Sequence, residues 1–258
     1  MTTRHPIRVP STLRWLTSQI ILLRPAGQDP LVHLPDADTS LVLRTTPAGR
    51  ADLLVAGPRT RATYHVGKDL PLCLRLRLRP GAARLLLGVP AGELVDRVVD
   101  IGELWNGTQE LKAALMRSGQ DPRRILEHLQ AALPARIAAR SHADLARYEQ
   151  VQAAAEALRD HHGQRREPIP AIARRLAISE RHLRDAFRDG VGLPPKRFER
   201  IERVRHVLTH GRRPKRWSQL AVTAGYYDQS HMTAEFRTLM GVTPTAYFTG
   251  RLPALQPC

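Results

Sequence analysis

An internal repeat in the last third of the chain most constrains what this sequence can fold into. Residues of the same kind recur there at an offset of 49 positions. The first copy contains Leu183, Phe187, Arg188, Gly192, Pro195 and Phe198, and the second contains Met232, Phe236, Arg237, Gly241, Pro244 and Tyr247. Upstream, Ala173 matches Ala221 at an offset of 48, so the second copy has one extra residue in its turn. The segment therefore predicts two copies of one helical unit.

The first copy has the pattern of a helix, a tight turn and a second helix. Pro170 suits the opening turn of the first helix, where its missing N–H costs nothing. Residues 177–179 form the turn, and Ser179 is the expected N-cap of the second helix. Gly190 and Gly192 are expected to end that helix.

The second copy follows the same plan. Ser218 is the expected cap of its first helix, and Gly225 supplies the turn. The following helix buries Met232 and Phe236 at helical spacing. Each copy therefore predicts a second helix whose opposite face points outward.

Positive charge gathers around this repeat. The 258 residues carry a formal net charge of +16, and residues 165–217 contain 16 basic and 6 acidic residues. Such a density attracts polyanions, because their condensed counterions are released on binding. Nucleic acid is therefore the leading partner, with a basic surface that only aids solubility as the alternative.

The segment 165–250 resembles the DNA-binding domain of AraC/XylS-family transcriptional regulators. Its most specific parts are residues 224–237 and 241–247, and the first copy agrees independently. The resemblance implies an all-α domain of two helix-turn-helix units joined by a long helix, here about 195–208. It also implies that the two recognition helices enter successive major grooves about 34 Å apart.

Positional matching to this family makes the outward residues of the two second helices the candidates for reading bases. They are Arg181, His182, Arg184, Asp185, Gln229, Ser230, His231 and Ala234. Arginine pairs best with guanine and glutamine with adenine, while alanine touches at most a thymine methyl. As alternatives, Asp185 only orients a neighbouring arginine, and His231 is an ordinary exposed residue.

Phosphate contacts are expected from basic residues beside these helices, and such contacts set affinity rather than sequence preference. The candidates are Arg188, Lys196, Arg197, Arg200, Arg203, Arg216 and Arg237, together with the rest of the run 212–216.

The first part of the chain consists of short apolar runs separated by turn residues, which is typical of short strands. In residues 72–79, leucines alternate with arginines, so one face is expected to be buried and the other wet. Arg75, Arg77 and Arg79 form a stripe on the other face. This stripe is expected to contact an acidic ligand, a carboxylate of the helical segment or DNA; the alternative is that it faces solvent alone. The overall prediction is an α+β chain whose N-terminal domain is a small antiparallel, cupin-like β structure followed by helices.

Helical spacing replaces the strand pattern beyond about residue 91. We predict a β-rich domain over 1–100, a helical segment over 101–162 and the DNA-binding domain over 163–258. The Ala-rich stretch 143–159 either forms a dimerisation surface or covers the sheet. A polar linker is expected at 161–168, with the domain boundary near 163.

Targeting signals are missing from the sequence. No apolar stretch approaches the roughly 20 residues of a membrane span, and no secretory signal opens the chain. The expected location is the cytoplasm. The two cysteines, Cys73 and Cys258, make neither a disulfide framework nor a cysteine zinc site.

A metal-dependent cupin enzyme with an accessory DNA-binding domain is the main enzymatic alternative. It needs clustered ligands, whereas His33, His65 and Glu93 stand alone in the sequence. Cys73 lies in an alternating strand without a nearby histidine and is interpreted as structural. No glycine-rich phosphate loop is present, so we expect no catalytic residue, no metal and no cofactor.

The sequence thus predicts a bacterial, sequence-specific transcriptional regulator that binds double-stranded DNA and has no enzymatic activity. The further candidate partners are a small-molecule effector, a second copy of the chain and RNA polymerase, with no membrane. A basic architectural protein that binds any duplex is the remaining alternative.

Overall fold

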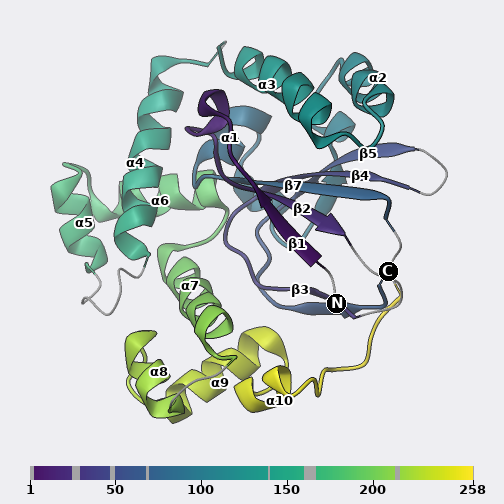
Figure 1. Ribbon diagram of the computed structural model, residues 1–258. Coiled ribbons are helices and arrows are strands. Elements are labelled where there is room, and N and C mark those ends of the chain that lie inside the picture. Colours follow the sequence, from purple (N-terminus) through teal and green to yellow (C-terminus); the bar gives the residue numbers. More distant parts are fainter. Residues whose placement is uncertain are drawn as a thin grey trace.

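The computed structural model describes residues 3–24, 30–46, 50–67, 70–138, 140–159, 167–212 and 216–257. A β-rich N-terminal part with helices on one side lies next to a row of C-terminal helices (Figure 1). Most of the predicted linker at 161–168, including the boundary near 163, lies outside the described residues.

The N-terminal part is built on an antiparallel sheet of six strands in the order β1-β2-β7-β4-β5-β8. These strands are β1 (Thr3–Ile7), β2 (Thr17–Arg24), β4 (Ser40–Thr45), β5 (Ala51–Ala56), β7 (Leu72–Leu78) and β8 (Val98–Asp100). A second sheet pairs β3 (Leu31–His33) with β6 (Thr63–His65). The predicted α+β fold with an N-terminal antiparallel β domain is confirmed.

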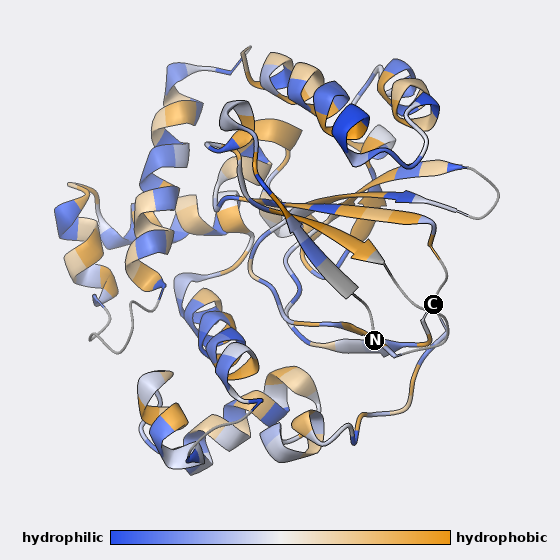
Figure 2. Cartoon of the chain, viewed as in Figure 1, coloured by the Kyte–Doolittle hydropathy of each residue, from blue (hydrophilic) through white to orange (hydrophobic). Residues whose placement is uncertain are grey.

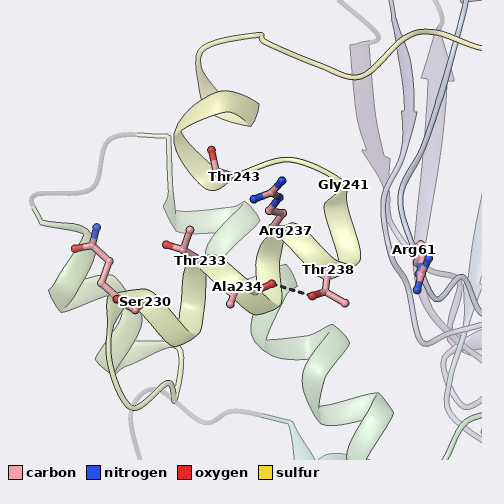
Figure 3. A pocket seen from close by; sticks show the side chains of 9 residues that line it. Arg61, Ser230, Thr233, Ala234, Arg237, Thr238, Gly241 and Thr243 are labelled. Atoms are coloured by element: carbon pink, nitrogen blue, oxygen red, sulfur yellow. Dashed lines mark hydrogen bonds between the residues drawn. The ribbon is translucent and has the colours of Figure 1, made fainter.

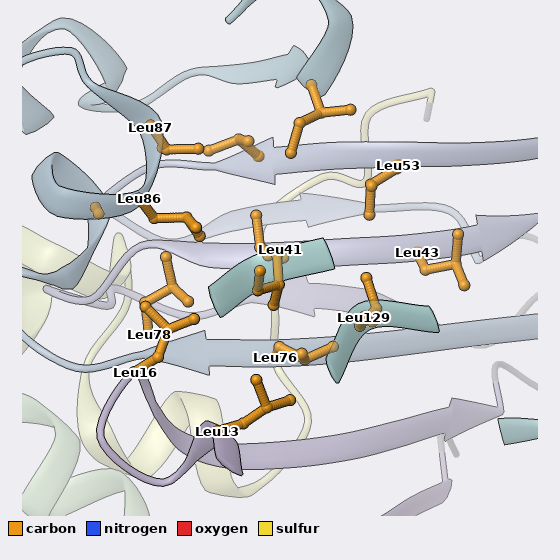
Figure 4. Close-up of a cluster of buried hydrophobic side chains, with 14 of the residues drawn as sticks. Leu13, Leu16, Leu41, Leu43, Leu53, Leu76, Leu78, Leu86, Leu87 and Leu129 are labelled. Atoms are coloured by element: carbon orange, nitrogen blue, oxygen red, sulfur yellow. The ribbon is translucent and has the colours of Figure 1, made fainter. Parts of the chain in front are cut away.

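Strand β7 lies in the middle of the large sheet, and every second one of its side chains is a leucine that points to the buried face. Leu74, Leu76 and Leu78 are fully buried, and each such side chain contributes about 2 kcal/mol through the hydrophobic effect. The leucines of the sheet meet Leu86 from α1 and Leu129 from α3 in one core (Figure 4).

Most helices lie beyond residue 91, as the spacing predicts, but the first helix comes before that point and β8 comes after it. The helices up to residue 158 are α1 (Ala82–Leu87), α2 (Gln109–Arg117), α3 (Pro122–Ala138) and α4 (His142–Leu158), with the short 3-10 turns η1 (Ser11–Leu13), η2 (Ala91–Leu94) and η3 (Ile101–Glu103). Figure 2 shows hydrophobic residues along the sheet and hydrophilic ones on the outer sides of α3, α4 and α7 (Pro195–His210). Among the described residues, no helix combines the length and apolar character needed to cross a membrane.

Helix α4 joins the two halves of the molecule. At its N-terminal end, the Tyr148 hydroxyl donates a hydrogen bond to the Trp15 carbonyl of the β domain. At its C-terminal end, Val151, Ala155 and Leu158 are buried in the core of the C-terminal helices. The buried residues of α4 thus pack with the C-terminal helices, whereas Tyr148 packs against the core of the β domain. A role of 143–159 in dimerisation stays a prediction.

The C-terminal helices reproduce the sequence repeat residue for residue. They are α5 (Ile169–Arg175), α6 (Glu180–Val191), α7 (Pro195–His210), α8 (Trp217–Thr223), α9 (Gln229–Met240) and α10 (Pro244–Phe248). Helices α5 and α8 are offset by 48 residues, and α6 and α9 by 49. The long helix predicted over about 195–208 is α7, which joins the two units.

The turns of the two units use the same left-handed backbone position. Ala177 has φ 53° and Gly225 has φ 78°, a region that glycine occupies without the steric cost that alanine bears. Ser179 caps α6 by accepting a hydrogen bond from the backbone N–H of His182. Asp228 plays the same part for α9.

Two details of the predicted units are wrong. Ser218 does not cap α8, because that helix begins one residue earlier at Trp217 and has no side-chain cap. Gly190 lies inside α6 rather than ending it, at a position where an added Cβ atom would lie 3.2 Å from the Val151 methyl groups. Its role is to let α6 approach α4 closely, and Gly192 alone ends the helix.

The arginine face of β7 is not the solvated face that the alternation predicts. Arg75 and Arg77 form ion pairs with the buried carboxylate of Asp36 at 2.6 and 2.7 Å. Arg77 also pairs with Asp38 at 2.9 Å. Arg79 donates instead to the Arg14 carbonyl at 2.6 Å. The carboxylates come from the segment before β4, which the sequence pattern does not place beside β7.

Cys73 lies in β7 with its thiol buried, and burial raises the thiol pKa to about 11. At pH 7 only about one thiol in ten thousand is then ionised, and the thiolate is the reactive form. In a Cys258→Ser variant, we expect Ellman's reagent to react with Cys73 only after unfolding in urea. Complete reaction of the folded variant within seconds would contradict the structural role.

Candidate nucleic-acid interface

Helix α6 presents a polar face to solvent and an apolar face to the protein. Leu183 and Phe187 are buried on its inner side at a spacing of one turn. The predicted base-reading residues of this helix are all exposed: Arg181, His182, Arg184 and Asp185. The inner residues fix the helix while the outer ones remain accessible to a ligand.

Acidic neighbours orient the arginines of α6. Arg184 donates to the Glu180 carboxylate at 2.7 Å, and Arg181 lies 3.9 Å from Asp185. Both are exposed pairs one turn apart, which contribute at most a few tenths of a kcal/mol. Either arginine can therefore leave its carboxylate for a nucleic acid at little cost.

Helix α9 has a matching outward face, which lines a hollow of about 970 Å³ (Figure 3). Gln229, Ser230 and Ala234 line it, while His231 is exposed beside Tyr226, their ring centroids 5.3 Å apart. The sequence prediction missed Thr233 and Thr238 in this hollow. The helical spacing could have found both, because Thr233 lies four residues after Gln229 and Thr238 lies eight residues after Ser230 on the same face of the helix.

A buried carboxylate holds α9 against α7. Glu235, on the inner side of α9, accepts hydrogen bonds from Arg200 at 2.9 Å and from Arg203 at 2.9 and 2.8 Å. The Arg203 guanidinium also lies 5.1 Å from the centroid of the Tyr226 ring. Burial alone raises the pKa of Glu235, but hydrogen bonds from Arg203 and Arg200 lower it below its ordinary value.

This arrangement changes the interpretation of two predicted phosphate contacts. The side chain of Arg203 is 16% exposed and that of Arg200 is 38% exposed, and both guanidiniums bind Glu235. We therefore assign these two residues to positioning α9. Direct contact of either with phosphate stays a prediction.

The other predicted phosphate contacts are exposed and, among the described residues, have no ion-pair partner. They are Arg188, Lys196, Arg197, Arg216 and Arg237. Arg212 is exposed as well, whereas 213–215 lie outside the described residues. These side chains lie on α6, α7 and α9 or next to α8, so their charge surrounds both outward faces.

The histidines that stood alone in the sequence come together on the small sheet. The ring centroids of His33 and His65 are 5.4 Å apart. Burial and the charge of Arg59 lower the pKa of His33 to about 4, so its ring is neutral at pH 7. Among the described residues, which include Glu93, there is no group of three or more histidine, cysteine or acidic side chains that could hold a metal ion.

Comparison with known families decides what the paired units are. Residues 172–250 match the family described as "Helix-turn-helix domain". They form a helix-turn-helix domain, the kind of domain that the resemblance to AraC/XylS-family regulators implies. The domain covers α6 to α10 and most of α5, so both outward faces belong to it. Its presence gives the chain a DNA-binding domain.

Solved structures similar to this chain include a domain of AraT and the protein ToxT. The C-terminal domain of AraT, a response regulator from Geobacillus stearothermophilus, is 20% identical, covers 41% of this chain and 88% of its own, and has a TM-score of 0.36. ToxT from Vibrio cholerae O395 is 11% identical, with 92% and 98% covered and a TM-score of 0.46. No curated protein matches the chain. The assignment of the helix-turn-helix domain therefore rests on the family match over residues 172–250.

Proposed function

We propose that the chain is a sequence-specific regulator in which α6 and α9 read bases in successive major grooves. The observation that carries this proposal is the duplication itself. Two helix pairs of equal length each bury one face and expose a polar one, and α7 joins them. The base-reading assignment of Arg181, Arg184, Gln229 and the other outward residues is part of the proposal.

The N-terminal domain is the proposed regulatory part, because it is bonded to the first unit and to the helix that joins the two units. Asp189 of α6 pairs with Arg84 of α1 at 3.4 Å and with Arg147 of α4 at 3.0 Å. Arg205 of α7 pairs with Asp36 at 3.2 Å. A small-molecule effector or a second copy bound to this domain changes DNA affinity only if it prefers one arrangement of the units.

The proposed location, partners and lack of enzymatic activity follow from the proposed role as a transcriptional regulator. A bacterial regulator of this kind acts in the cytoplasm, where it meets double-stranded DNA and RNA polymerase. We propose no enzymatic activity and no cofactor for it.

Selection of bound duplexes from a random-sequence pool tests the proposed function. A reproducible motif with two half-sites about one helical turn, about 34 Å, apart supports a sequence-specific regulator. A pool without a motif, and equal salt dependence on every duplex, identifies a non-specific architectural protein instead.

Substitutions at Arg184 and Lys196 are expected to separate base reading from phosphate binding. Arg184→Ala should lower affinity for the selected site by about 1–3 kcal/mol and relax the preference at one base position. Lys196→Ala should weaken binding to all duplexes alike and flatten the salt slope by about one unit. Titrations of both variants on the selected duplex and on a scrambled one measure the difference. If both lose the same affinity on both duplexes, the division into base-reading and phosphate-binding residues is wrong.

A further inference from the structure

One residue of the N-terminal domain lies in the hollow formed by the recognition helix α9. Arg61, from the segment between β5 and β6, lines this hollow together with Gln229, Thr233, Arg237 and Thr238 (Figure 3). It is separated from α9 by more than 160 residues of sequence. The surface around α9 is therefore built by two parts of the chain.

The backbone on both sides of Arg61 is tied down. The N–H and hydroxyl of Thr60 donate to the Asp96 carboxylate at 2.7 and 2.6 Å. On the other side, the Ala62 N–H donates to the Leu239 carbonyl at 2.7 Å. Arg61 is thus held at the C-terminal end of α9.

A further bond joins the same two parts. The Tyr64 hydroxyl donates to the Met240 carbonyl at 2.6 Å, at the last residue of α9. Carbonyls at a helix end lack hydrogen-bond donors within the helix. Here β6 and the residue before it supply donors to two such carbonyls. The position of Arg61 relative to α9 is therefore set by hydrogen bonds to α9 itself.

The Arg61 guanidinium is unpaired within the described part of the chain. It is exposed, and among the described residues it forms no hydrogen bond and no ion pair. Its neighbour Arg59 is mostly buried near Asp36 and Asp96, and Arg75 is bound to Asp36. Arg61 is thus the arginine of this region whose charge the protein leaves free.

The chemistry of the hollow suits an anion. Its lining contains two arginines, Arg61 and Arg237, together with the hydroxyl and amide side chains of α9 and Thr243. No carboxylate is among the lining residues. Two guanidiniums that share one hollow with hydroxyl and amide groups can donate hydrogen bonds to the phosphate oxygens of a nucleic-acid backbone.

We propose that Arg61 is a phosphate-binding residue through which the N-terminal domain contacts the DNA beside the groove that α9 reads. This inference rests on the proposed function. It makes the N-terminal domain part of the DNA interface, so that any shift of the domain relative to α9 changes a phosphate contact directly.

Arg61→Gln tests the inference, with Arg117→Gln as the control that removes the same charge from exposed α2, remote from α9 (Figure 1). On the selected duplex and on a scrambled one, Arg61→Gln should lower affinity roughly three- to tenfold and flatten the salt slope by about one unit. Arg61→Lys should keep the slope, and Arg117→Gln should match the unaltered chain. Thermal melting should not change, because Arg61 bonds to no side chain in the part of the chain that the structure describes.

Unchanged affinity and slope for Arg61→Gln would overturn the inference, and so would tighter binding, which would mean that Arg61 hinders access to α9. Failure of the inference differs from failure of the proposed function. In the first case the unaltered chain still selects a motif and Arg184→Ala still relaxes it. In the second case no motif is selected, Arg184→Ala has no site-specific effect, and the inference falls as well.

Discussion

Replacing Asp36 by asparagine is expected to lower the free energy of unfolding by about 3–5 kcal/mol. Asp36 is buried, with a side chain 5% exposed, between Arg75 and Arg77 of the sheet and Arg205 of α7. The neutral amide would leave these guanidiniums without their common counter-charge in a site with little water. Urea unfolding at pH 7, followed by circular dichroism, measures the loss.

Asp52→Asn is the matched control for this prediction. Asp52 pairs with Arg44 at 3.0 Å, but both side chains are partly exposed, so the expected loss is below about 1 kcal/mol. Equal losses for the two variants would show that burial adds nothing to the Asp36 cluster.

The pH dependence of the Asp36 effect has a definite sign. Burial raises the pKa of Asp36, but Arg77, Arg205 and Arg75 together lower it far below its ordinary value of 3.8. A carboxylate whose pKa is lower in the folded state adds stability above its unfolded pKa and loses it as the pH falls further. The difference between the unaltered chain and Asp36→Asn should therefore shrink below about pH 4.

Glu202 of α7 belongs to the same group of ion pairs as Asp36, but its pKa is shifted in the opposite direction. Burial raises its pKa, although Arg205 and Arg159 oppose the shift. One carboxylate oxygen has no hydrogen bond, and its nearest guanidinium nitrogens lie 3.7 and 4.0 Å away. The cluster thus joins α7 to the sheet through one strongly bonded carboxylate and one weakly bonded one.

The repeat made the C-terminal domain predictable almost to the residue. Paired glycines, prolines and aromatic residues at offsets of 48 and 49 identify equivalent helix positions, because a turn and a buried face each need a particular residue type. The exceptions were local. Ser218 lies two positions after the true N-cap, Arg216, and Gly190 serves a contact with Val151 in another helix.

Contacts between distant segments were beyond the sequence pattern. Alternation placed Arg75 and Arg77 on one face of β7, but nothing local shows that Asp36 and Glu202 meet that face. The same limit applies to Arg61, which no spacing rule connects with α9. Patterns of period 2 and 3.6 report which face of an element is apolar, and they do not report which polar groups the fold brings together.

Glu235→Gln is expected to separate the two roles considered for Arg200 and Arg203. Neutralising Glu235 removes the counter-charge of the mostly buried Arg203, so the free energy of unfolding should fall by about 3 kcal/mol. Glu180→Gln, which breaks only the exposed pair with Arg184, is the control and should cost less than about 0.5 kcal/mol. Urea unfolding compares the two variants.

DNA affinity gives the second readout of Glu235→Gln. If Arg200 and Arg203 chiefly bind phosphate, releasing them from Glu235 should strengthen binding to every duplex and steepen the salt slope. If they position α9, binding to the selected site should weaken, because the helix that carries Gln229 and Ser230 loses its attachment to α7. We expect the second result, since the Glu235 carboxylate takes up three hydrogen bonds from these arginines on the side of α9 that faces away from the hollow. Tighter binding to both duplexes would return the two arginines to the phosphate-binding set.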